Sequence, residues 1–297
     1  MNQTRPETAA EPQWHLKLFG KSLTKQAKLR EILRLLGPAG AAEGLDLGGD
    51  NGVISYFLRR HGGTWCSADL SPKAVASIRQ LVGGDVREMT GSELPFEDAR
   101  FDVVVVIDLL EHVRDDARFI EECHRVLKPA GRLIVNVPHV KRGAVLRPIR
   151  RLLGLTDERH GHVRPGYTES QLFDLLKDGF DVKEAHTYSR FFVEALDTVI
   201  QFASKAASRG ASDAKGVMLD RQDFGRVAKL FRVYSVLYPF FLLAAQLDAL
   251  LSFTRGYSLI GVAHKRPWRP RRAPVLSDGR SIAEAALGSK IGTAAPF

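Results

Sequence analysis

Residues 44–52 read GLDLGGDNG, a short apolar run that ends in a glycine-rich turn. The apolar spacing of the following residues, up to Arg60, is helical, so the stretch predicts a strand, a tight turn and a helix. Glycines in such a turn let the backbone approach a ligand closely. We therefore expect a ligand-binding loop at this strand end, inside an α/β sheet.

The flanking sequence repeats this alternation of strand and helix. Residues 103–107 are apolar on both faces, as in a parallel strand that helices cover on each side. The pattern predicts a doubly wound, Rossmann-like α/β fold. The expected elements are strands at 44–49, 64–69, 101–108, 131–139, 181–188 and 256–264, and helices at 51–60, 72–81, 115–127 and 169–177.

The chain divides into segments of different composition. The last part is rich in Pro, Arg, Ala and Gly without periodicity, and an apolar, helix-prone insertion is expected between the last two strands. The expected division is 1–40 for an N-terminal tail and leading helix, 41–190 for the core, 191–255 for the helical insertion, 256–266 for the final strand and 267–297 for a disordered tail.

Composition excludes several classes of protein. The two cysteines, Cys66 and Cys123, fall in apolar elements, so we expect neither a disulfide framework nor a cysteine metal site. Residues 1–13 lack the apolar core of a secretory signal, which favours a cytoplasmic protein. The net charge of +9 gathers at 141–151 and 265–272, so we expect local basic patches and no nucleic-acid partner or obligate protein partner.

Four further stretches lie at ordered spacings after the glycine turn. They read LPF at 94–96, FDVV at 101–104, LEHV at 110–113 and VLKPAGRL at 126–133. Together with the turn they resemble the class I S-adenosylmethionine-dependent methyltransferases, type 11 methyltransferase domain, which include ubiquinone and menaquinone biosynthesis enzymes. The close resemblance covers 44–139 and continues loosely through 162–188.

The turn itself favours this methyl donor over a nicotinamide dinucleotide. Counting from Gly48, the second and third glycines of the dinucleotide fingerprint are replaced by Asp50 and Val53. An acidic residue near a helix N-terminus opposes a pyrophosphate, whereas S-adenosylmethionine carries no phosphate. Asp69 ends the second strand, where a carboxylate can accept hydrogen bonds from both ribose hydroxyls.

The resemblance implies a seven-stranded sheet with an antiparallel last strand and S-adenosylmethionine as cofactor. At the position of Thr90 the family usually has an aspartate, so this chain departs from the pattern there. The implied contacts with the cofactor are Asp46, Gly48 and Gly52 around the methionyl part, Asp69 on the ribose, Leu70 on the adenine, Thr90 and Gly91 at the adenine edge, and Asp108 and Leu109 beneath the sulfonium.

Methyl transfer from a sulfonium mainly requires the acceptor atom to be held in line with the methyl carbon, so a base is optional. A histidine with a near-neutral pKa suits a hydroxyl acceptor. Residues 139–167 follow the carboxyl edge of the sheet and are the candidate acceptor segment; they include His139, His160, His162, Arg164 and Tyr167. We select His139, His162 and Asp108 as candidate catalytic residues, with an exposed loop position as the alternative for each histidine.

Glu111 and His112 resemble a pair that holds a divalent cation in some quinone-biosynthesis relatives. The alternative is a solvated helix start, and His160 and His162 lack a third ligand at helical spacing. We therefore expect no required metal.

The predicted function is methyl transfer to a small, hydrophobic or lipid-linked acceptor, at oxygen or carbon. One alternative is a nucleic-acid methyltransferase, but residues 108–111 read DLLE, where amino-directed DNA enzymes have Asn or Asp, Pro, Pro and an aromatic residue. Another is a non-catalytic cofactor-binding protein of the same fold.

The insertion contains an apolar run at 233–253, flanked by Arg232 and Arg255. By length alone it could span a bilayer, but Asp248 and Pro239 oppose spanning, and the chain must return to the sheet it left. Two roles stay open: a peripheral helix on the anionic inner face of a membrane, or a helical cap over an acceptor pocket.

Overall fold

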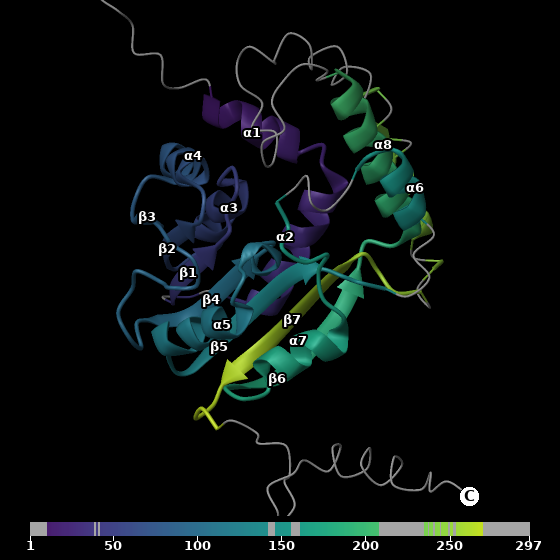
Figure 1. The fold of residues 1–297 in the computed structure, drawn as a ribbon. Helices are drawn as coiled ribbons and strands as arrows, with labels where there is room; N and C mark the ends of the chain where they lie inside the picture. Colours follow the sequence, from purple (N-terminus) through teal and green to yellow (C-terminus); the bar gives the residue numbers. More distant parts are fainter. Residues whose placement is uncertain are drawn as a thin grey trace, which may run out of the picture.

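The computed structural model describes residues 11–38, 40, 42–141, 146–155, 161–207, 235–236, 238–239, 241–243, 245–248, 250–251 and 254–269. Most of the expected tail, much of the apolar run and His160 therefore lie outside the described residues. Within these ranges the chain forms one sheet with helices on both faces (Figure 1).

The sheet has seven strands in the order β3-β2-β1-β4-β5-β7-β6. Strand β7 runs antiparallel to both of its neighbours, and all other pairs are parallel. This confirms the predicted doubly wound fold with an antiparallel last strand. The strands are β1 Glu43–Leu47, β2 Thr64–Asp69, β3 Val86–Glu88, β4 Phe101–Ile107, β5 Leu127–Pro138, β6 Phe180–Tyr188 and β7 Ser258–Lys265.

Helices cover both faces because the central strands are apolar on both. In β4, Val104 and Val106 belong to the core under α5 and α7, whereas Val103 and Val105 belong to the core under α2 and α3. The helices are α1 Glu11–Phe19, α2 Leu23–Leu36, α3 Val53–His61, α4 Pro72–Val82, the 3-10 helix η1 Leu110–His112, α5 Asp116–Val126, α6 Leu146–Leu152, α7 Glu169–Leu176 and α8 Phe191–Ala207.

Three boundaries differ from the sequence prediction. The leading helix is two helices, because the chain turns at Gly20 and Ser22 caps α2 by accepting a hydrogen bond from the Lys25 amide. Strand β5 begins at Leu127 instead of residue 131. Trp268, expected in the disordered tail, packs its ring against His124 at 5.0 Å between centroids and beside Gly179.

A helical lobe lies beyond the carboxyl ends of the strands, at the upper right of Figure 1. We call it the cap lobe; it consists of α6, α8 and the described residues within 235–251. The insertion leaves β6 and returns to β7 at adjacent points, since Tyr188 pairs with Ser258 and the Tyr257 amide donates to the Tyr188 carbonyl at 3.1 Å. Among the described residues, no helix is both long and apolar enough to traverse a bilayer.

Candidate functional site

A pocket opens where β1 and β4 separate, which is the point at which the strand order reverses. Ligands of open α/β sheets bind at such a switch point. The pocket is lined by the loop after β1, the end of β2, the end of β4 and the inner side of α2, while His112 and His162 close one side. Helix α2 thus covers a site built by the sheet.

The loop after β1 needs glycine for two separate reasons. At Gly48 the backbone has φ +83°, and a Cβ would lie 2.3 Å from the Ile107 carbonyl oxygen. Gly48 lines the pocket, as predicted. Gly52 also has a positive φ, but a Cβ there would meet the Ile78 backbone at 2.9 Å. Gly52 therefore serves the packing of α3 on α4 and is not part of the pocket lining.

Asp46 supports this loop from below and does not line the pocket. Its carboxylate is fully buried and accepts hydrogen bonds from Ser55 Oγ, from Ser67 Oγ at 2.8 Å and from Arg59 Nη1 at 3.4 Å. Burial raises the pKa of Asp46, and the Arg59 charge and the two hydroxyls act in the opposite direction. The side chain of Asp46 points toward α3, so the structure does not bring it to the pocket lining, and its place beside the methionyl group stays a prediction.

Asp69 lies at the end of β2 and lines the pocket together with Leu70, as predicted. One carboxylate oxygen accepts a hydrogen bond from the Ser71 amide at 2.9 Å, which fixes the orientation of the group. Thr90 and Gly91 form an exposed turn in which Thr90 bridges to Glu93. These two residues are not part of the pocket lining, so the structure does not bring them to the other predicted residues.

Asp108 follows β4 and also lines the pocket, next to Leu109. Its φ of +44° is unusual for a residue with a side chain and turns the carboxylate into the pocket. Asn136 Nδ2 donates to one Asp108 oxygen at 2.6 Å, and the Tyr188 hydroxyl donates to Asn136 Oδ1 at 2.5 Å. A buried chain of hydrogen bonds therefore holds Asp108 from behind.

Two lysines of α2, which the sequence analysis missed, face this carboxylate and the glycine loop. Lys28 forms an ion pair with Asp108, and Lys25 lies 3.5 Å from Asp50. Burial alone would lower the pKa of Lys28, but the Asp108 carboxylate outweighs it and the pKa is raised. Lys28 is thus a cation inside the pocket. No motif marks it, and only its place one helical turn after Lys25 puts both on one face.

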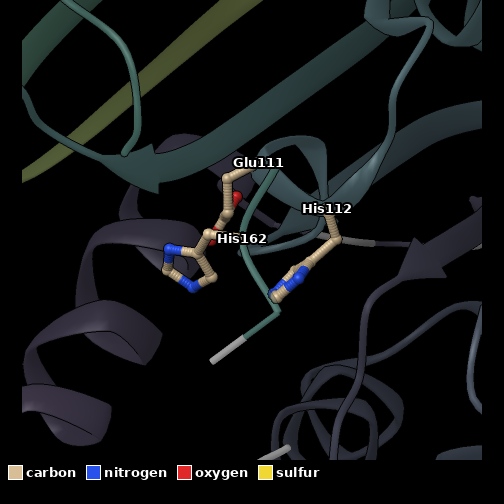
Figure 2. A group of neighbouring side chains, drawn as sticks. All are labelled: Glu111, His112 and His162. Atoms are coloured by element: carbon tan, nitrogen blue, oxygen red, sulfur yellow. The ribbon is translucent and has the colours of Figure 1, made fainter. Parts of the chain in front are cut away.

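A cluster of three possible metal ligands adjoins the pocket (Figure 2). Glu111 and His112 belong to η1, and His162 comes from the facing loop; one ligand atom from each lies within 4.8 Å of the others. The His112 and His162 rings meet edge to face at 4.7 Å. The Val163 amide donates to the Glu111 carbonyl at 2.9 Å, so the backbone holds this loop against η1.

The Glu111 side chain shows that the expected solvated helix start is wrong. Glu111 is only 1% exposed, and its Oε2 has no hydrogen-bond partner among the described residues. Burial, and then the nearby Asp108 charge, raises the pKa of Glu111 to about 8. One carboxylate and two imidazoles are a donor set that suits divalent transition metals, and a cation would satisfy the buried oxygen. The residues present therefore fit a metal ion.

His139 does not reach the pocket, contrary to its proposed catalytic role. Its side chain is fully buried, with Nδ1 2.8 Å from the Gly256 carbonyl oxygen and Nε2 3.2 Å from Glu169 Oε2. Arg164 and Tyr167 are also occupied, since both bind Asp116. Of the predicted acceptor segment, His162 is the member that lines the pocket.

Part of this chain is similar to known sequences. Residues 45–135 match the family model described as a methyltransferase domain. The ubiquinone biosynthesis O-methyltransferase of Pseudomonas aeruginosa is 36% identical over 98 residues, and that of Azotobacter vinelandii is 37% identical over 98 residues. Each match covers 31% of this chain and 42% of the relative, so the chain spans less than half the length of the curated relatives it matches.

Solved structures agree on the fold. The cyclase SpnF superposes with a TM-score of 0.52 at 20% identity, covering 81% of both chains. A Thermotoga maritima protein described as an S-adenosylmethionine-dependent methyltransferase, possible histamine N-methyltransferase, superposes with a TM-score of 0.51 at 16% identity, covering 86% of this chain and 96% of that one. At such identities these likenesses show the architecture alone.

Proposed function

We propose that this chain is a class I methyltransferase and that it transfers a methyl group from S-adenosylmethionine to a small, hydrophobic or lipid-linked acceptor, a proposal that the match of residues 45–135 to a methyltransferase domain supports. The observation that carries the proposal is the polarity of the switch-point pocket. Its lining includes a carboxylate, Asp69, an ammonium, Lys28, and the glycine loop after β1.

These groups complement the parts of the donor. Asp69 is oriented by the Ser71 amide to accept from a ribose diol. Lys28 suits the methionyl carboxylate, because a lysine ammonium is a compact charge on a flexible stem and can exchange Asp108 for another carboxylate. The Asp108 carboxylate, which lines the pocket, favours a positive sulfonium through electrostatic attraction.

The donor supplies an activated methyl group, so the protein's task is mainly to orient the acceptor and exclude water. Asp108 is already engaged by Lys28 and Asn136, which favours an electrostatic role over that of a base. His162 is the candidate base for a hydroxyl acceptor, since it lines the pocket. If Glu111, His112 and His162 hold a divalent cation, His162 is a ligand and does not act as the base, and the cation would supply Lewis-acid polarisation of an acceptor oxygen.

Incubation of the protein with methyl-labelled donor and separate lipid, nucleic-acid and protein fractions tests the acceptor class. We expect label in a lipid or small-molecule fraction. The variant His162→Ala should lower turnover more than donor affinity, because the residue is assigned to the acceptor side. Label in nucleic acid, or equal losses in both properties, would contradict the assignment.

A second candidate is a protein that keeps the donor site without transferring the methyl group. The similarity to a protein described as a cyclase favours considering it, because the same architecture there carries a different description. Calorimetry with S-adenosylmethionine separates the two readings. Donor binding without label in any fraction would support the second candidate.

A further inference from the structure

Exposed apolar side chains gather on the outer face of the cap lobe. Among the described residues, every exposed large apolar side chain except Val163 and Phe173 belongs to this lobe. Leu152 of α6 is 88% exposed, and Val236 and Leu250 are each 73% exposed. Exposed apolar side chains concentrated in one part of a protein mark an interaction site more often than single scattered ones do.

The spacing of these residues shows that they form a face. Val236, Leu243 and Leu247 are described as helical and follow one another at seven and four positions, a spacing typical of one helix face, and Leu250 follows in a turn. Helix α6 lies beside α8 in the same lobe (Figure 1). The exposed side chains of the three segments are Ile149, Leu152, Phe191, Val199, Phe202, Val236, Leu242, Leu243, Leu247 and Leu250.

The opposite side of the lobe is fixed to the rest of the protein. Asp248 is buried and accepts hydrogen bonds from the amides of Arg190 and Phe192, both at 2.8 Å, so it caps the start of α8. The Tyr238 hydroxyl accepts from Gln26 Nε2 of α2 at 3.1 Å. The segment therefore has a defined inner side, and the apolar face is its outer side.

The charged side chains of the lobe follow the same division into an inner and an outer side. The acidic residues in its described part all turn inward: Glu194 binds Lys141 at 2.9 Å, Asp197 lies 3.7 Å from Arg150, and Asp248 caps α8. In the described part of this region the exposed charges are Arg151 and, just after the lobe, Arg255, which is 69% exposed and pairs with Glu169 at 3.2 Å. The outward charge of this region is positive.

We propose that this outer face docks on an anionic lipid surface, with its apolar side chains inserted at the headgroup boundary and the lobe parallel to the bilayer. Apolar residues flanked by arginines are what an anionic interface attracts. A second copy of this chain fits less well, because a symmetric contact would bring like charges together without acidic partners. This docking does not depend on methyl transfer.

Flotation of the full chain with phosphatidylcholine vesicles, with and without phosphatidylserine, tests the proposal. We expect binding to the anionic vesicles, weakening as salt is raised. The double variant Leu243→Asp, Leu250→Asp should bind at least about tenfold more weakly, because it places charges on the inserted face. Phe173→Asp is the matched control, since Phe173 is an exposed apolar residue on α7, and it should bind as the unchanged protein does.

Thermal unfolding of each variant checks that the fold is kept, since all three side chains are exposed. Vesicle binding that survives the double variant, or is lost equally in Phe173→Asp, would overturn the proposal. Light scattering supplies the other outcome. A dimer that the double variant dissociates, without vesicle binding, would assign the face to a second copy and also overturn it.

Discussion

Polar groups are arranged in opposite ways in two regions of the molecule. One region is the half of the sheet that holds the pocket, and the other is the cap lobe. Around β1, β2 and β4, polar side chains converge on an open pocket, which Asp69 and Lys28 line. In the cap lobe the carboxylates of Glu194 and Asp248 are used internally and the outer face is apolar. The first region matches a family model; the lobe lies outside the matched residues 45–135.

The difference shows what constrains each region. A pocket for a chemically constant ligand demands particular residues at strand ends, which is why short motifs reveal it. The lobe is held by contacts between residues far apart in the sequence, such as Asp248 with Arg190, and no short pattern records those. Four variants would break or sharpen this contrast, from the largest expected effect to the smallest.

Gly48→Ala should abolish donor binding and destabilise the protein by about 3 kcal/mol or more, because the new Cβ would clash with the Ile107 carbonyl and the φ is positive. Gly83→Ala is the control: its φ is +62° but nothing lies within 4 Å of its Cβ position. That variant should cost only about 1 kcal/mol. Calorimetry and urea unfolding measure both, and equal effects would refute the close-approach argument.

Lys28→Met should weaken S-adenosylmethionine binding by about 1.5–3 kcal/mol, the value of a hydrogen bond to a charged group. Lys28→Arg should restore most of the affinity. Lys25→Met is the matched control, because the Lys25 side chain is 39% exposed and Lys28 only 19%. An exposed pair contributes at most about 1 kcal/mol. Equal losses at both lysines, measured by calorimetry, would remove the special role of Lys28.

Asp248→Ala should lower the free energy of unfolding by about 1–2 kcal/mol, because it removes the cap of α8. Donor affinity should change less than about twofold, since Asp248 lies in the cap lobe and not in the pocket lining. Urea unfolding and calorimetry on the same preparation test both parts. A marked loss of donor affinity would show that the two regions are coupled.

Glu111→Gln should change the pH dependence of stability. With its pKa raised to about 8, folded Glu111 keeps a proton that the unfolded chain releases near its ordinary pKa of 4.5. The stability of the unchanged protein therefore falls as pH rises from about 4.5 to about 8. Glu111→Gln should flatten this fall in urea unfolding.

Zinc or manganese ions provide the second arm of that test. A bound cation competes with the proton on Glu111, so added metal should restore stability above pH 8 in the unchanged protein. The variant should respond much less. If both proteins respond equally, the three-residue cluster is not where the metal acts.

Most of the sheet could be predicted from the sequence because six of its seven strands have a local apolar pattern, whereas β3 is only three residues long and was not among the expected strands. Residues 103–107 are apolar at every position, and helical spacing frames them on both sides. The boundary between α1 and α2 also has a local signal in the sequence, since Ser22 is a residue type that commonly caps a helix N-terminus. The fold thus follows from short-range patterns.

The site could be predicted only in part, because the burial of each side chain and the direction in which it points decide whether it reaches the pocket. Asp69 and Asp46 both belong to strands, yet one lines the pocket and the other binds Arg59 beneath it. Glu111 is charged by type but buried by the packing of a distant loop. Lys28 reaches Asp108 only because α2 folds across the strand ends. No local sequence pattern indicates such contacts between residues that are far apart in the chain.

The antiparallel pairing of β6 with β7 has a consequence for how this protein could be re-engineered. Because Tyr188 and Tyr257 are hydrogen-bonded neighbours, the segment between them leaves and re-enters the sheet at adjacent points of β6 and β7. Replacing this segment by a short turn between β6 and β7 would cost little loop-closure entropy and leave the other strands undisturbed. The same two anchor points could accept a transplanted segment of different length, so a new surface could be grafted onto an unchanged donor pocket.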